Sequence, residues 1–141
     1  MGVQLIKLCV GAETLDDVIN WHRRRAFDYK GQQAVQHITR NFPKRADELL
    51  DGGSLYWVVK GRIVARNPIL GFEDAVTERG KPGCAFILGV PLTATEPRAH
   101  RPFQGWRYLD GERAPADLPP GMDANDIPEE LLAELKDLGL V

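Results

Sequence analysis

The stretch from residue 52 to residue 73 constrains the fold of this chain more than any other part of the sequence. Two apolar runs rich in β-formers, Leu55 to Val59 and Ile63 to Phe72, flank Lys60-Gly61, and this pattern predicts a β-hairpin with a tight turn. Pro68 interrupts the second run. Because proline has no N–H to donate to a neighbouring strand, we expect a bulge or a sheet edge at that position.

Both faces of the first predicted strand are apolar. Successive side chains of a strand point to opposite faces, so Leu55, Trp57 and Val59 share one face while Tyr56 and Val58 share the other. A strand that is apolar on both faces must be covered on both sides. We therefore predict that the hairpin belongs to a small closed barrel.

The remaining segments mix strands and helices. Thr14 is typical of a helix N-cap, because aspartates follow it in the first turn. The order lacks regular βαβ alternation, so the predicted class is α+β, a small mixed β-barrel with flanking helices. Further strands are predicted at residues 3–10, 37–40, 84–90 and 103–109, helices at 14–27, 43–50 and 129–138, and irregular segments at 30–36, 73–83 and 91–102.

Length and composition indicate one ordinary globular domain. The chain has 141 residues, of which 43% are hydrophobic and 27% charged. We find no secretion signal and no apolar run near the roughly 20 residues that a membrane-spanning helix needs. The sequence therefore predicts a cytoplasmic protein without a membrane partner.

Charge is distributed unevenly along the chain. Residues 1–110 hold 16 Lys and Arg against 12 Asp and Glu, whereas residues 111–141 hold 2 against 8. We interpret residues 1–110 as the domain body and residues 111–141 as a proline-rich linker with a C-terminal helix docked on that body. Two alternatives stay open: docking on a second copy, which would make a homodimer, and a position over a binding cleft in competition with a polyanion.

Several common reaction chemistries find no support in the sequence. Ser54 is the only serine and lacks the closing glycine of a nucleophile elbow. Cys9 and Cys84 lie in apolar runs and are interpreted as small buried hydrophobes. The three histidines are widely spaced and match no zinc pattern, and no phosphate-binding glycine motif is present. No metal and no cofactor is predicted.

Two segments combine basic and aromatic residues, His37 to Arg45 and Arg98 to Tyr108. Arginine binds phosphate through two parallel N–H groups, and an aromatic face stacks on an unpaired base. This combination suits RNA or another single-stranded or flipped-out ligand. The alternative is that the aromatic rings are core and the arginines pair with C-terminal acids. The predicted nucleic-acid-binding residues are Arg40, Lys44, Arg45, Arg98, Arg101, Arg107, Tyr56 and Trp106.

The segments Pro43 to Trp57 and Glu96 to Leu109 carry a resemblance to a bacterial family of unknown activity, domain of unknown function 1489. A more distant resemblance comes from the helix, the strand Leu-Tyr-Trp-Val, the Lys-Gly turn and Ile63-Val64-Ala65. Together these are similar to the central hairpin of PUA-like barrels, which include the ASCH and EVE domains. Two departures are that Asp51 precedes the glycines and that alanine replaces a glycine. The resemblance implies a small mixed barrel that binds RNA or a modified nucleotide in a cleft.

A hydrolase that acts on a modified nucleobase is the alternative function, because some ASCH proteins have such an activity. It needs a lysine or threonine together with a carboxylate, and the candidate catalytic residues are Thr39, Lys44 and Glu96. A partly buried lysine near other cations can act as a base at neutral pH. The competing interpretation is that Lys44 and Glu96 are ordinary surface charges. Whether the protein is an enzyme is left open, and the binding module is preferred.

Overall fold

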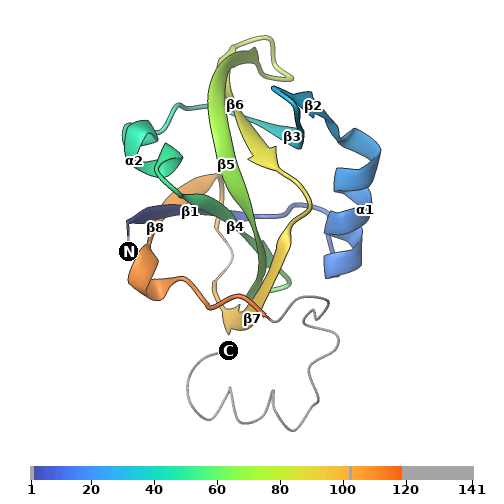
Figure 1. The fold of residues 1–141 in the computed structure, drawn as a ribbon, viewed down its shortest axis with the longest axis vertical. Coiled ribbons are helices and arrows are strands. Elements are labelled where there is room, and N and C mark those ends of the chain that lie inside the picture. Colours follow the sequence, from blue (N-terminus) through green and yellow to red (C-terminus); the bar gives the residue numbers. More distant parts are fainter. Residues whose placement is uncertain (1, 102, 119–141) are drawn as a thin grey trace, which may run out of the picture.

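The computed structural model describes residues 2–101 and 103–118, which form a twisted sheet with two helices on opposite sides of it in the view of Figure 1. The α+β class predicted from the sequence is confirmed. In chain order the elements are β1 (Val3–Leu8), α1 (Leu15–Arg25), β2 (Phe27–Tyr29), β3 (Gln32–Thr39), α2 (Ala46–Leu50), β4 (Ser54–Val59), β5 (Arg62–Val76), β6 (Pro82–Gly89), β7 (Thr93–Ala99), β8 (Trp106–Asp110) and a 3₁₀ turn, η1 (Gly111–Arg113).

The sheet is open. Its strands follow the order β2-β3-β6-β5-β4-β1-β8, and β7 pairs with β5 beside this path. β1 and β4 run parallel, whereas the other pairs are antiparallel. Within the described part of the chain, β2 and β8 lie at the two ends of the order and do not pair with each other. The predicted closed barrel is therefore wrong.

The predicted hairpin is confirmed as β4 and β5, with Lys60 at φ 48° and Gly61 at φ 78° in its turn. Positive φ at both central residues gives the turn a twist that matches the flanking strands. Every residue of β4 is buried. Leu55, Trp57 and Val59 enter the main core, while Tyr56 and Val58 enter a second apolar cluster.

Both faces of β4 are covered because the sheet bends along β5, and not because the sheet closes into a barrel. The first part of β5 (62–68) pairs with β4, and 69–76 pairs with β6. Phe103, in the connection from β7 to β8, packs in the second cluster together with Ile63 and Leu109. The sheet thus folds over its own second face, and an apolar pattern on both sides of a strand fits this arrangement as well as it fits a barrel.

The bend in β5 coincides with Pro68. Pro68 pairs with Ser54 of β4, and the register between β5 and β6 shifts between Ile69 and Gly71. The predicted bulge is therefore present directly after the proline. A bulge bends its strand locally and increases the twist, which suits the point at which β5 passes from one partner to the next.

Helix α1 begins as predicted. The Thr14 hydroxyl accepts a hydrogen bond from the Asp17 N–H at 3.2 Å, and the Asp17 carboxylate accepts one from the Thr14 N–H at 3.1 Å. This reciprocal pair satisfies N–H groups that a helix end leaves without a partner. The helix ends at Arg25, two residues before the predicted end, because Phe27 already belongs to β2.

Two predicted irregular segments are strands instead. Residues 30–36 contain most of β3, which pairs with β2 across Lys30-Gly31, a turn with φ values of 50° and 85°. Residues 91–102 contain β7. Pro97 is tolerated there because it lies in a bulge between the pairs Ile63–Arg98 and Ala65–Ala94.

The first part of the predicted linker is attached to the domain body. Glu96 N–H donates to the Ala116 carbonyl at 2.8 Å, and Leu118 N–H donates to the Ala94 carbonyl at 2.9 Å. The Arg66 side chain also donates two hydrogen bonds to the Asp117 carboxylate, one from Nε to Oδ1 and one from Nη2 to Oδ2, each at 2.8 Å. The predicted helix at residues 129–138, and with it the alternatives for its docking, lies outside the described residues.

Candidate functional site

A large open cleft lies between α1, the end of β1, the end of β3 and the turn after β5, with a volume of about 1740 Å³. Small-molecule sites usually measure about 300–1,000 Å³, so this cleft has room for an extended ligand. Its charged lining is mainly basic, with six cations against three carboxylates. The cations are Lys7, Arg23, Arg24, Arg25, Arg40 and Arg79, and the carboxylates are Glu13, Asp17 and Glu78.

The floor of the cleft continues the inward faces of two strands. Along β1, Val3 and Leu5 are buried in the main core, and Lys7 is the next residue on that face. Along β3, Val35 is buried in the same core and His37 follows it in the same way. The apolar core therefore gives way to a lysine and a histidine where the two strands reach the cleft.

Aromatic rings enclose His37. Its ring centroid lies 6.3 Å from that of Trp21 and 5.6 Å from that of Trp57, both in edge-to-face geometry. The Arg25 guanidinium carbon lies 4.9 Å from the Trp21 ring centroid, a cation–π contact. Trp57 is 2% exposed and donates its indole N–H to the Asn67 side-chain oxygen at 2.8 Å. The aromatic part of the floor is thus fixed in place by the core.

The two basic groups at the floor are both forced toward their neutral forms. Burial lowers the pKa of His37 from 6.5 to about 4, and the charges of Lys7 and His22 act in the same direction. Burial also lowers the pKa of Lys7, and the charge of the nearby Cys9 acts in the opposite direction. Carboxylates are not among the groups that shift either pKa. The floor is therefore basic and lacks an internal counter-charge.

Two of the three carboxylates in the cleft already have partners. Asp17 accepts hydrogen bonds from the backbone N–H groups of Glu13 and Thr14, which lower its pKa. Glu13 forms an ion pair with Lys60 at 3.8 Å. In the part of the chain that the structure describes, none of the six cations of the cleft forms an ion pair with a carboxylate.

His22 lies beneath the cleft and is 4% exposed, with both ring nitrogens buried and without a hydrogen-bond partner among the described residues. Its ring centroid lies 5.1 Å from that of Trp21 and 6.3 Å from that of Trp57. Burial lowers its pKa from 6.5 to about 4. A buried polar group without a partner costs about 1–3 kcal/mol, so His22 is a weak point of this part of the core.

The two predicted basic-aromatic segments meet away from the cleft. The Arg45 backbone N–H donates to the Tyr108 hydroxyl at 3.2 Å, and the Arg45 guanidinium carbon lies 5.5 Å from the Tyr108 ring centroid. Arg45 also forms an ion pair with Glu48, so its charge is already compensated. Of the predicted nucleic-acid-binding residues, only Arg40 lines the cleft.

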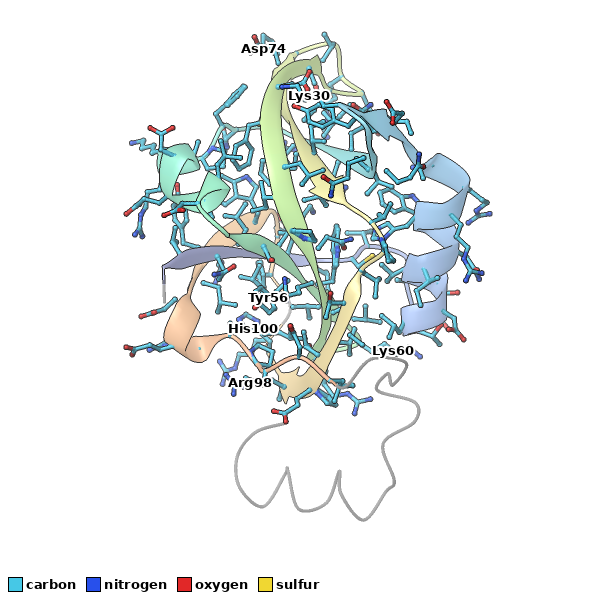
Figure 2. All side chains as sticks on the ribbon, in the orientation of Figure 1. Lys30, Tyr56, Lys60, Asp74, Arg98 and His100 are labelled. Carbon is cyan, nitrogen blue, oxygen red and sulfur yellow. The ribbon has the colours of Figure 1, made fainter. Side chains whose placement is uncertain are left out.

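The other predicted arginines have local contacts. Arg98 donates to the Arg113 carbonyl, and the Arg107 guanidinium carbon lies 4.7 Å from the Phe103 ring centroid. Lys44 and Arg101 are exposed. Figure 2 shows Arg98 at the β7 end of the molecule, opposite the end at which Lys30 and Asp74 lie.

The two predicted stacking residues are parts of the packed interior. Tyr56 is 6% exposed and lies in the second apolar cluster, where burial raises the pKa of its hydroxyl. Trp106 is half-buried against the main core, with its ring centroid 6.0 Å from that of Phe86. A base would find no free face on Tyr56. The half-buried Trp21 lines the cleft and offers a better placed ring.

The predicted catalytic residues are only partly assembled at the cleft. Thr39 lines it, but the Thr39 hydroxyl donates to the Asn41 carbonyl at 3.2 Å. Lys44 and Glu96 do not line the cleft. Within the described ranges, no three His, Cys, Asp or Glu side chains are grouped closely enough to hold a metal ion. No helix in those ranges is long and apolar enough to cross a membrane.

The predicted site residues did not include Lys7, Trp21, Arg79 or the arginines at 23–25, all of which line the cleft. Lys7 carried a usable signal. In a strand whose alternate residues Val3 and Leu5 face inward, a lysine at the next inward position breaks the apolar pattern. The partnership of Lys7 with His37 has no local signal, because 30 positions separate the two residues.

Comparison with known proteins gives a match at the level of the family. A family model described as "Protein of unknown function (DUF1489)" matches residues 5–141. No curated protein and no solved structure matches the chain.

Proposed function

The chain belongs to the DUF1489 family of proteins of unknown function, and we propose that it is a binding module for nucleic acid or a modified nucleotide, with the ligand in the cleft beside α1. The observation that carries the proposal is the charge of this cleft. Six cations line it without an ion-pair partner in the described part of the chain, and two of its three carboxylates are engaged elsewhere. Such a surface favours a polyanion.

The kinds of side chain in the cleft support nucleic acid over other polyanions. The guanidinium groups of Arg40 and Arg79 suit phosphate oxygens. Trp21 adds an aromatic surface, and Val10, Ile38 and Val76 add exposed apolar surface along the same cleft. A ligand that alternates phosphates with planar bases matches this mixture. The resemblance to PUA-like domains points to the same class of ligand.

The proposal is tested by measuring the affinity of the full chain for single-stranded RNA over a range of salt concentrations. For single strands, log K falls with log salt by about 0.7 for each phosphate contact. We expect strong salt dependence, and we expect Arg40→Ala combined with Arg79→Ala to reduce the slope by about 1.4. Fluorescence anisotropy with labelled oligonucleotides measures both quantities.

Two matched double variants locate the site. Arg98→Ala with Arg101→Ala removes the same charge at the β7 end of the molecule, and Lys30→Ala with Lys81→Ala removes it outside both places. If Arg98→Ala with Arg101→Ala reduces the slope and Arg40→Ala with Arg79→Ala does not, the ligand lies at the basic and aromatic segment around β7 that the sequence predicted. Absent or salt-independent binding across RNA and modified nucleotides would overturn the proposal altogether.

The hydrolase alternative is separated from the binding module by examining the ligand after incubation. We expect acylated and other modified nucleosides to remain unchanged in mass, because the cleft holds only one of the three candidate catalytic residues. Turnover that stops in Lys44→Ala would favour the enzyme instead.

A further inference from the structure

We propose that the floor of the cleft, where Lys7 and His37 lie together, is a subsite for an oxyanion group at the end of the ligand. The chemical class is a terminal phosphate of a strand or nucleotide, or a carboxylate carried by a modified base. This inference rests on the proposed function and adds to it a requirement on the end of the ligand. Arg40 and Arg79, which also line the cleft, would hold the backbone phosphates of the same molecule.

The geometry brings two basic side chains to one place. Lys7 is the register partner of Trp57 across the β1–β4 pair, and the His37 ring contacts the Trp57 ring. Both side chains line the cleft, so a ligand can reach them from solvent. Trp57 is itself fixed by its hydrogen bond to Asn67. The two groups are thus held around a rigid ring rather than on mobile loops.

The charges around this place favour an added anion. The charged and titratable groups around His37 come from four segments of the chain. They are Lys7 of β1 and Cys9 directly after it, Asp17, His22 and Arg25 of α1, Arg40 directly after β3, and Glu78 and Arg79 of the turn after β5. Of these groups, Lys7 and His22 lower the pKa of His37, and Asp17 already accepts two backbone N–H groups. An oxyanion at the floor would supply the negative charge that the described residues do not.

The enclosure of the floor makes such a contact strong. Trp21 and Trp57 keep water from two sides of His37, and hydrogen bonds between charged groups strengthen where water is excluded. A bound oxyanion favours the charged form of His37 and of Lys7, so binding takes up a proton. The affinity for ligands with a charged end is therefore expected to rise as the pH falls toward about 4, the pKa of His37 in the free protein.

The first experiment compares one RNA sequence with a 5′-phosphate, a 3′-phosphate or hydroxyl groups at both ends, using the full chain. We expect one of the phosphorylated ends to bind about tenfold more tightly than the hydroxyl ends. Lys7→Met is expected to remove this preference, while the salt-dependent binding through Arg40 and Arg79 persists. Lys30→Met, which changes an exposed lysine outside the cleft, is the matched control and is expected to keep the preference.

The second experiment needs no nucleic acid. Inorganic phosphate is titrated against the full chain, followed by the NMR signal of the His37 ring, and acetate is titrated separately as the carboxylate probe. We expect a saturating shift in the wild type with the favoured probe, and its loss in Lys7→Met. Lys7→Arg, which keeps the charge, is expected to retain the shift and guards against a variant that fails to fold.

The outcomes separate this inference from the proposed function. Equal affinity for all three RNA ends with no shift of His37 would overturn the oxyanion subsite and leave the binding module intact. A shift of His37 with phosphate in a protein that binds no RNA would support the subsite and overturn the nucleic-acid function. A response to acetate alone would identify a carboxylate as the source of the charge.

Discussion

Replacing Trp57 with alanine is expected to lower the free energy of unfolding by about 3–5 kcal/mol. Trp57 is 2% exposed and is among the largest fully buried side chains. Its loss leaves a cavity in the main core and leaves the fully buried Asn67 oxygen without its indole donor. Domains of this size have about 5–15 kcal/mol of stability in total. Urea denaturation followed by circular dichroism measures the change.

Two further variants separate the cavity from the hydrogen bond. Trp57→Phe retains a ring but removes the N–H, and is expected to cost about 1–3 kcal/mol through the unpaired Asn67. Trp106→Ala, at a half-buried position, is expected to cost less than Trp57→Ala. The interpretation of Trp57 as the central packing residue would be wrong if Trp57→Ala were no more damaging than Trp106→Ala.

Acid is expected to destabilise the protein between pH 6.5 and pH 4, because His22 and His37 both have a pKa that folding lowers to about 4. The pKa of His22 falls from 6.5 to about 4 on folding because the ring is buried. In this window the unfolded chain binds a proton that the folded protein excludes, so stability rises with pH and is lost as the pH falls. At 1.36 kcal/mol for each unit of pKa, the loss attributable to His22 is about 3 kcal/mol.

The variant His22→Leu tests this assignment. It removes the titrating group and two buried nitrogens without partners, so we expect unchanged or higher stability at pH 7 and a flatter stability curve down to pH 4. Val18→Ala, at a buried position on the same helix, is the control and should lower stability by a similar amount at both pH values. A variant His22→Leu with the same acid sensitivity as the wild type would show that another group is responsible.

The parts of the fold that the sequence predicted correctly have local causes. The turn at Lys60-Gly61, the bulge after Pro68 and the cap at Thr14 each follow from the chemistry of a few neighbouring residues. The turn at Lys30-Gly31 has the same chemistry, but the polar residues after it concealed β3. Barrel closure was predicted wrongly because it depends on whether the two ends of the sheet meet, and no short segment encodes that.

The candidate site was less accessible from the sequence for a related reason. Clusters of basic and aromatic residues in the sequence predicted a site at residues 37–45 and 98–108. Of these two segments, mainly His37, Thr39 and Arg40 line the cleft. The cleft draws its remaining cations from α1, β1 and the turn after β5. These segments come together only through the β1–β4 and β3–β6 pairings. A site built from distant segments requires the topology before its residues can be grouped.

The long strand β5 has a consequence for how the protein opens. One strand carries the backbone ladders to β4, β6 and β7, so both halves of the sheet depend on it. Neither half can detach without breaking ladders that hold the other, which favours a single cooperative unfolding unit over independent local openings. The backbone amides of β5 are therefore expected to exchange with deuterium last and together, at the rate of global unfolding, while those of the three-residue strand β2 exchange first among the strands.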